Sequence, residues 1–126
     1  MNSLLIVTEG ENRLKYRLDK KREWLIGRPY EDNRPDIELH DKSVSRRQGR
    51  FQNIDGVWFY LDNNRGNGSY HNGKRIKAGI NGRIRPVMLE NGDVLSFGCK
   101  KTEEGLVAAV QAEYLENCEE RIQVRD

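Results

Sequence analysis

Three segments of this 126-residue chain carry side chains that could hold a phosphate group. They are Gly27-Arg28, residues 43–48 (Ser-Val-Ser-Arg-Arg-Gln) and residues 67–73 (Asn-Gly-Ser-Tyr-His-Asn-Gly). An arginine presents a planar fork of donors that fits phosphate oxygens, hydroxyls donate to the same oxygens, and loops of small polar residues can add backbone N–H groups. Each segment follows a short apolar run, so we expect all three to lie in loops held by strands.

The elements that must position these loops are short strands. Runs rich in β-branched or aromatic residues predict them at residues 4–7, 14–18, 24–26, 57–61 and 94–97. In the second run, Leu14, Tyr16 and Leu18 alternate with Lys15 and Arg17, which is typical of a strand buried on one face.

Turn-forming dipeptides separate these runs. They are Asp55-Gly56, Asn67-Gly68, Asn72-Gly73, Asn81-Gly82 and Asn91-Gly92, all of which tolerate positive φ. A chain that reverses so often between short strands indicates an antiparallel β-sandwich or barrel.

The C-terminal part is less clear. Residues 103–120 are rich in the good helix formers Ala, Leu, Glu and Gln, yet residues 106–110 form a short apolar run after Gly105. We favour a strand over about 106–114 that pairs with residues 94–101 and fills the last edge of the sheet, with a helix as the alternative. We therefore expect one domain at residues 1–115 and a polar tail at residues 116–126.

Charge is balanced overall but not along the chain. The 22 Lys and Arg nearly match the 20 Asp and Glu, which gives no reason to expect binding to nucleic acid or to a membrane. Residues 63–87, however, hold six basic and no acidic residues, whereas residues 88–126 hold four basic and nine acidic ones. This asymmetry favours an anionic partner for the middle of the chain, or simply solvated loop charges.

Several functional classes find no support in the sequence. Cys99 and Cys118 are too few and too far apart for a disulfide framework or a metal site, so we expect reduced thiols and no metal. There is no signal-peptide pattern and no segment near the ~20 apolar residues of a membrane span, which predicts a cytoplasmic protein. His40 and His71 lack a nucleophile or carboxylate at a recognisable spacing, and no phosphate-loop glycine pattern opens a helix. We therefore expect neither catalysis nor a cofactor, and a monomer by default.

The order and spacing of the motifs resemble a forkhead-associated domain. The matching parts are Gly27-Arg28, residues 36–39 with Asp41, and residues 43–48, 62–73 and 89–98, and the resemblance extends over about residues 4–98. It implies an all-β, eleven-stranded, antiparallel-rich sandwich. It also implies that the loops at one end bind a phosphothreonine in a partner protein.

The resemblance assigns roles to four side chains. Arg28 and Ser45 become phosphate ligands and Arg46 a further donor, whereas Asn67 bonds the main chain of the bound peptide. Each has a plainer reading: Arg28 in a surface ion pair, Arg46 as a solvated arm, and Asn67 in an ordinary Asn-Gly turn. For Asn72-Gly73 we expect a turn.

The chain departs from the family at three positions. Gln48 stands where the family usually has a His that links the binding loops, and an amide can also donate and accept. Arg65 and Gly66 stand where the family commonly has Ser and Thr, so a hydroxyl is lost and a second cation is gained near the expected phosphate. The predicted site is therefore Arg28, Ser45, Arg46, Arg65, Gly66 and Asn67.

Two hypotheses follow. The first is a non-catalytic, phosphothreonine-dependent module that recruits or regulates a partner phosphorylated by a Ser/Thr kinase, with about micromolar affinity. The second is a scaffold of the same fold that binds partners independently of phosphorylation, through a sheet face or its C-terminal segment.

Overall fold

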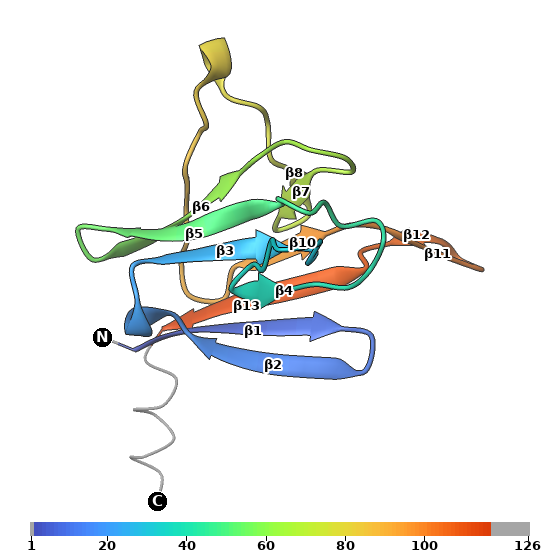
Figure 1. Ribbon diagram of the computed structural model, residues 1–126, viewed down its shortest axis with the longest axis horizontal. Helices are drawn as coiled ribbons and strands as arrows, with labels where there is room; N and C mark the ends of the chain where they lie inside the picture. Colours follow the sequence, from blue (N-terminus) through green and yellow to red (C-terminus); the bar gives the residue numbers. More distant parts are fainter. Residues whose placement is uncertain (1, 117–126) are drawn as a thin grey trace, which may run out of the picture.

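The computed structural model describes residues 2–116, which form thirteen strands and two short 3-10 helices (Figure 1). The strands are β1 (Ser3–Glu9), β2 (Asn12–Arg17), β3 (Glu23–Gly27), β4 (Ile37–Glu38), β5 (Gly49–Ile54), β6 (Val57–Asp62), β7 (Ser69–His71), β8 (Lys74–Arg75), β9 (Val87–Met88), β10 (Val94–Phe97), β11 (Lys100–Thr102), β12 (Gly105–Val107) and β13 (Val110–Glu116). The helices are η1 (Leu18–Lys20) and η2 (Ile80–Gly82). The expected tail and Cys118 lie outside the described residues, apart from Glu116 at the end of β13.

Eleven strands form the two layers of a sandwich, as predicted. One sheet has the order β2-β1-β13-β10-β7-β8 and the other β4-β3-β5-β6-β9, while β11 and β12 form a separate hairpin. All pairs are antiparallel except β3 with β4. The expected all-β, antiparallel-rich fold is confirmed.

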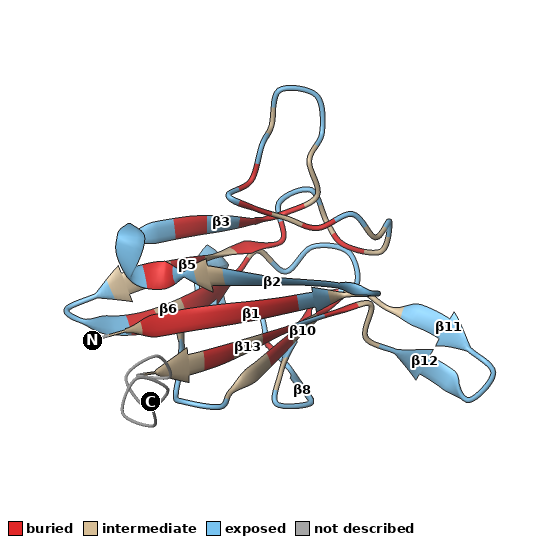
Figure 2. Cartoon of the chain, turned by 90° about the horizontal axis from the view of Figure 1, so that it is seen from below, coloured by how far each residue is buried: buried red, intermediate tan, exposed pale blue. Residues whose placement is uncertain are grey.

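The core lies between the layers and is rich in aromatic residues. Phe51 and Tyr60 of one sheet have ring centroids 5.0 Å apart, and Tyr60 lies 5.6 Å from Phe97 of the other sheet. All three are fully buried, and Figure 2 shows the buried positions on the central strands of both layers, whereas β2, β11 and β12 are mostly exposed. Such contacts between layers fix the separation of the two sheets.

The C-terminal part is strand, so the helix alternative for residues 103–115 is wrong. The expected continuous strand over 106–114 is instead divided at residues 108–109 into β12 and β13. β13 pairs with β1 on one side and β10 on the other, so it lies inside the six-stranded sheet and not at its edge. Because successive side chains of a strand point to opposite faces of the sheet, Val110, Ala112 and Tyr114 share the face that is buried in the core.

The predicted one-sided burial of residues 14–18 is partly wrong. Leu14 is 55% exposed, Tyr16 is half-buried against Trp24, and Leu18 is buried but belongs to η1. The physical reason is that β2 is an edge strand, and only the part near Tyr16 packs against the other sheet.

One segment rises from the sandwich between β8 and β9. Residues 76–86 carry η2 at their tip, drawn in yellow at the top of Figure 1. Ile76 at its base is buried, whereas Ile80 at its tip is 69% exposed. Among residues 2–116, none of the helices has the length and apolar character required to cross a membrane.

Candidate functional site

Strand register brings the three sequence motifs to one end of the sandwich. Ile26 of β3 pairs with Gly49 of β5, and Gly49 pairs with Asp62 of β6. The residues just beyond these positions therefore enter neighbouring loops, namely residues 28–36, 39–48 and 63–68. We call these three loops the loop cluster.

Arg28 and Ser45 lie together in this cluster. The Arg28 backbone N donates to the Ser45 carbonyl (3.1 Å), and Arg28 Nε donates to the Val44 carbonyl (3.0 Å). The guanidinium is thus held by one of its nitrogens while no ion pair engages it among residues 2–116. The alternative prediction, that Arg28 forms a surface ion pair, does not hold among residues 2–116.

Gly27 permits this close approach. A Cβ at position 27 would lie 2.1 Å from the Arg46 carbonyl oxygen, well inside van der Waals contact. Any larger residue here would push the loop of Ser45 away from Arg28. The Gly-Arg dipeptide is therefore a packing requirement as well as a source of charge.

Four arginines line one cleft of about 470 Å³. Its walls are formed by Arg28, Tyr30, Asn33, Ser45, Arg46, Arg47 and Arg65, with no carboxylate among them. The Arg46 guanidinium stacks on the Tyr30 ring, with its carbon 3.3 Å from the ring centroid, which orients a side chain that would otherwise be a free arm. A concave site with four cations and no carboxylate in its lining favours a dianion.

Gly66 and Asn67 lie beside the cleft in the turn from Arg65 to Gly68, closed by the Gly68 N to Arg65 O bond (3.0 Å). Gly66 has a φ of +57°, and a Cβ there would lie 2.8 Å from Ser45 Oγ. The Asn67 amide donates to the Ser43 carbonyl (3.0 Å), so in this structure it links two loops. Asn72-Gly73 is the predicted turn, with φ values of +50° and +86°.

Gln48 holds the loop cluster together from within. Its side chain is buried, with Oε1 accepting from Ser45 N (2.9 Å) and Nε2 donating to Gly68 O (3.1 Å) and Ser69 Oγ (2.9 Å). One amide therefore joins the loop of Ser45 to the start of β7. This is the linking role that the sequence predicted an amide could fill.

A buried polar network continues below Gln48. The Asp62 carboxylate accepts from the Tyr60 hydroxyl (2.8 Å), the Ser69 hydroxyl and Asn64 N (2.9 Å). Burial, reinforced by the nearby Asp62 charge, raises the pKa of Tyr60 well above its ordinary value, so its hydroxyl keeps its proton. The network fixes both ends of the loop of Arg65.

The loop of Ser45 is also anchored at its start. Asp41 Oδ1 accepts from Ser43 Oγ (2.6 Å) and Ser43 N (2.9 Å), and Ser43 Oγ in turn accepts from Cys99 N (2.9 Å). The hydrogen bonds from the Ser43 hydroxyl and N–H hold the pKa of Asp41 below its ordinary value, against a smaller opposing effect of burial.

A second, more apolar pocket of about 310 Å³ adjoins the cleft. Leu25, Ile26, Pro35 and Gly49 line it, together with Asn63 and three residues shared with the cleft, Asn33, Arg46 and Arg47. A ligand that entered the cleft could therefore place an uncharged side chain here.

Sequence reasoning missed Tyr30, Asp62 and the contribution of Arg47. Tyr30 follows Arg28 by two residues, and an aromatic residue among loop cations is a signal for a cation–π contact. Asp62 at the end of a buried strand carried no comparable signal. No cluster of His, Cys, Asp or Glu within residues 2–116 is arranged to hold a metal ion, and His71 bonds Asp93 (2.9 Å) outside the cleft.

Comparisons with known proteins agree with this architecture. A family model described as "FHA domain" matches residues 24–98, which is more than half of the chain. No curated protein matches the chain.

Solved structures show the same fold at low identity. Full-length yeast Pml1p has a TM-score of 0.70 at 22% identity, covering 90% of this chain and 81% of that one. The FHA domain of CT664 from Chlamydia trachomatis has a TM-score of 0.68 at 20% identity, with 92% and 98% covered. The yeast Dun1 FHA domain, solved in complex with a doubly phosphorylated (pT) peptide derived from Rad53 SCD1, has a TM-score of 0.63 at 18% identity, with 92% and 74% covered.

Proposed function

Because the chain belongs to the FHA (forkhead-associated) domain family, we propose that it is a non-catalytic module that binds phosphothreonine in a partner protein. The observation that carries the proposal is the convergence of Arg28 and Ser45 in one cleft lined by cations. Related FHA domains bind phosphorylated peptides, as the complex of the Dun1 domain illustrates.

The chemistry of the cleft fits a phosphate dianion. The Arg28 guanidinium is held through Nε, which leaves its terminal nitrogens as donors for phosphate oxygens. The Ser45 hydroxyl lies in the wall of the cleft next to Gly66 and adds a neutral donor. Arg65 and Arg46 supply further positive charge, which offsets the absence of a hydroxyl at Gly66.

The rest of the peptide would lie across the loop cluster. The adjoining pocket lined by Leu25, Ile26 and Pro35 suits an apolar side chain near the phosphothreonine. Asn67 has an exposed amide whose oxygen is free to accept a main-chain N–H while its nitrogen bonds Ser43. Charge-assisted bonds of about 1.5–3 kcal/mol each, less the cost of ordering the peptide, predict about micromolar affinity.

Calorimetry with an oriented phosphothreonine peptide library, run against the unphosphorylated peptides, tests the proposal. We expect binding only to the phosphorylated set. We also expect affinity to fall as the pH drops below about 6, where the phosphate takes up its second proton. Equal binding to both sets would favour the phosphate-independent scaffold instead.

The variant Arg28→Ala should lower affinity at least about 100-fold, which corresponds to the loss of two charge-assisted bonds. Arg13→Ala removes the same charge from the exposed strand β2 and should leave affinity unchanged. Thermal unfolding of both variants shows whether the loss is one of binding or of folding. A folded Arg28→Ala protein with unchanged affinity would overturn the proposal.

A further inference from the structure

The cationic surface of the molecule extends beyond the phosphate cleft onto the protruding segment. We define the basic extension as Arg65, Arg75, Lys77, Arg83 and Arg85. All five side chains are exposed, and none of them forms an ion pair within residues 2–116. No acidic residue occurs between positions 63 and 87.

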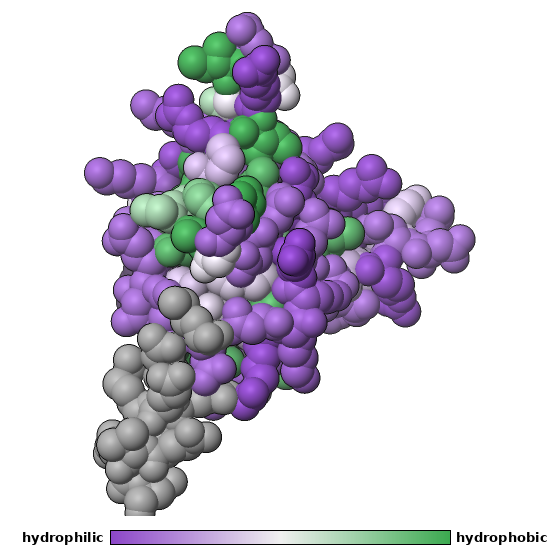
Figure 3. All heavy atoms as spheres, turned by 90° about the vertical axis from the view of Figure 1, so that its left-hand side faces the viewer, coloured by the Kyte–Doolittle hydropathy of each residue, from purple (hydrophilic) through white to green (hydrophobic). Residues whose placement is uncertain are grey.

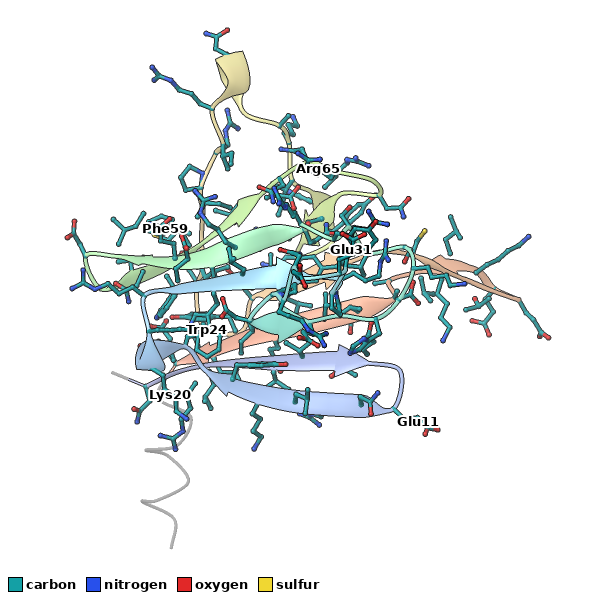
Figure 4. All side chains as sticks on the ribbon, in the orientation of Figure 1. Glu11, Lys20, Trp24, Glu31, Phe59 and Arg65 are labelled. Carbon is teal, nitrogen blue, oxygen red and sulfur yellow. The ribbon has the colours of Figure 1, made fainter. Side chains whose placement is uncertain are left out.

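The basic extension begins inside the cleft. Arg65 lines the cleft and forms one end of the turn that Gly68 closes. The Arg75 guanidinium packs against Gly68. A Cβ at position 68 would be only 2.8 Å from Arg75 Nη2. Figure 4 shows Arg65 on the side of the sandwich from which the protruding segment rises.

The segment then carries the remaining cations away from the cleft. Its base is fixed by the bond from Ile76 N to Ser69 O (2.9 Å) and by the buried Ile76 side chain. Its two limbs touch at Gly79, where a Cβ would lie 1.3 Å from the Arg83 carbonyl oxygen. Lys77, Arg83 and Arg85 are therefore confined to one narrow projection, whose surface is hydrophilic between apolar patches at its tip and its base (Figure 3).

Such an arrangement raises the free energy of the isolated domain through repulsion, and an anion placed along it would relieve that repulsion. We propose that the basic extension binds a run of acidic residues next to the phosphothreonine in the same partner peptide, on one side of it. The inference rests on the proposed function, because the phosphothreonine in the cleft sets where the acidic run begins. Exposed charges of this kind change affinity moderately and speed association.

Three phosphothreonine peptides of equal length test the inference by fluorescence anisotropy. One carries a run of glutamates before the phosphothreonine, one carries the run after it, and one has neutral flanks. We expect one acidic peptide to bind about 10-fold more tightly than the neutral one, and the gain to disappear in about 0.5 M salt. If neither acidic peptide binds more tightly, the inference is overturned while the proposed function stands.

A charge-matched pair of variants localises the effect. Lys77→Gln/Arg83→Gln/Arg85→Gln should abolish the gain from the acidic run and leave affinity for the neutral phosphopeptide unchanged. Arg13→Gln/Lys15→Gln/Lys20→Gln removes the same charge from exposed positions of β2 and η1 and should preserve the gain. Equal loss in both would mean that net charge alone is responsible, and would overturn the inference.

Two further outcomes separate the alternatives. If the first triple variant weakens binding of a single-stranded oligonucleotide more than binding of the acidic phosphopeptide, the extension is a nucleic-acid surface and the inference is wrong. If the neutral phosphopeptide itself fails to bind the unmodified protein, the proposed function fails, and the inference fails with it.

Discussion

The loop cluster and segment 77–86 both carry exposed basic side chains, yet they are held very differently. Gln48, Asp62 and Asp41 fix the cluster through side-chain hydrogen bonds to four backbone groups in two of its loops. In segment 77–86, by contrast, Arg83 N bonds Ile80 O (3.1 Å), and no side chain takes part in a hydrogen bond among the described residues.

This difference matches the two modes of anion recognition that we propose for the two regions. Discrimination of phosphate from a carboxylate depends on donors held in a defined geometry, which the buried network below the cluster supplies. Attraction of a run of carboxylates depends mainly on charge density, which tolerates loosely held side chains. Changes to the network should therefore affect stability and phosphate affinity, whereas changes to residues 77–86 should affect neither.

The largest effect is expected for Asp62→Ala. Loss of this carboxylate removes the acceptor that the buried Tyr60 and Ser69 hydroxyls share and leaves them only their longer contacts with each other (3.1 Å) and with Gln48 O (3.3 Å), which should lower the free energy of unfolding by about 3 kcal/mol. Urea denaturation measures the change, and Asp32→Ala, at an exposed position, should stay within about 0.5 kcal/mol. Equal effects of the two variants would show that the buried network does not stabilise the domain.

Two isoleucines sharpen the boundary between core and segment. Ile76→Ala should cost about 2–4 kcal/mol, because this side chain packs in the core at 7% exposure. Ile80→Ala, four residues later, should change the free energy of unfolding by less than about 0.5 kcal/mol, because its side chain is already in water. A large cost at Ile80 would show that the tip packs against something in solution.

Gln48→Leu should weaken phosphopeptide binding about 10-fold, because the substitution removes the acceptor of Ser45 N and the donor to Gly68 O. Gln48→His, which restores one donor and one acceptor, should recover part of the loss. Gln52→Leu on the outer face of β5 is the matched control. Unchanged affinity in a folded Gln48→Leu protein would mean that the loops keep their positions without the amide.

The smallest effect is expected for the free energy of unfolding at acidic pH. The folded state lowers the pKa of Asp41, so its hydrogen bonds stabilise the protein fully above the unfolded pKa of about 3.9 and less as the pH falls through the lower folded pKa. Asp41→Asn should therefore flatten the loss of unfolding free energy below about pH 4. Asp36 and Asp93, whose pKa values are also lowered because hydrogen bonds outweigh burial, should account for the loss of unfolding free energy that remains in Asp41→Asn below about pH 4. An identical pH dependence of unfolding free energy in the unmodified protein and in Asp41→Asn would contradict the anchoring role of Asp41.

Much of the fold was accessible from the sequence because local chemistry dictates it. The runs at residues 4–7, 24–26 and 57–61 became strands, since β-branched and aromatic side chains suit a pleated surface that is buried on one face. Asp55-Gly56 and Asn72-Gly73 became turns with positive φ at both residues, which few other dipeptides adopt at low cost. The helix alternative for residues 103–115 failed because pairing with neighbouring strands outweighed local helix propensity.

The sequence by itself determined which side chains could meet a phosphate: Arg28, Ser45, Arg46 and Arg65 all line the cleft. Only the tertiary structure decided that they converge, because the register of Ile26 with Gly49 and of Gly49 with Asp62 places their loops side by side. The register also decided that β13 lies inside its sheet and that Asp62 is buried below the loops. These outcomes depend on pairings between residues far apart in the chain, and no local pattern encodes such pairings.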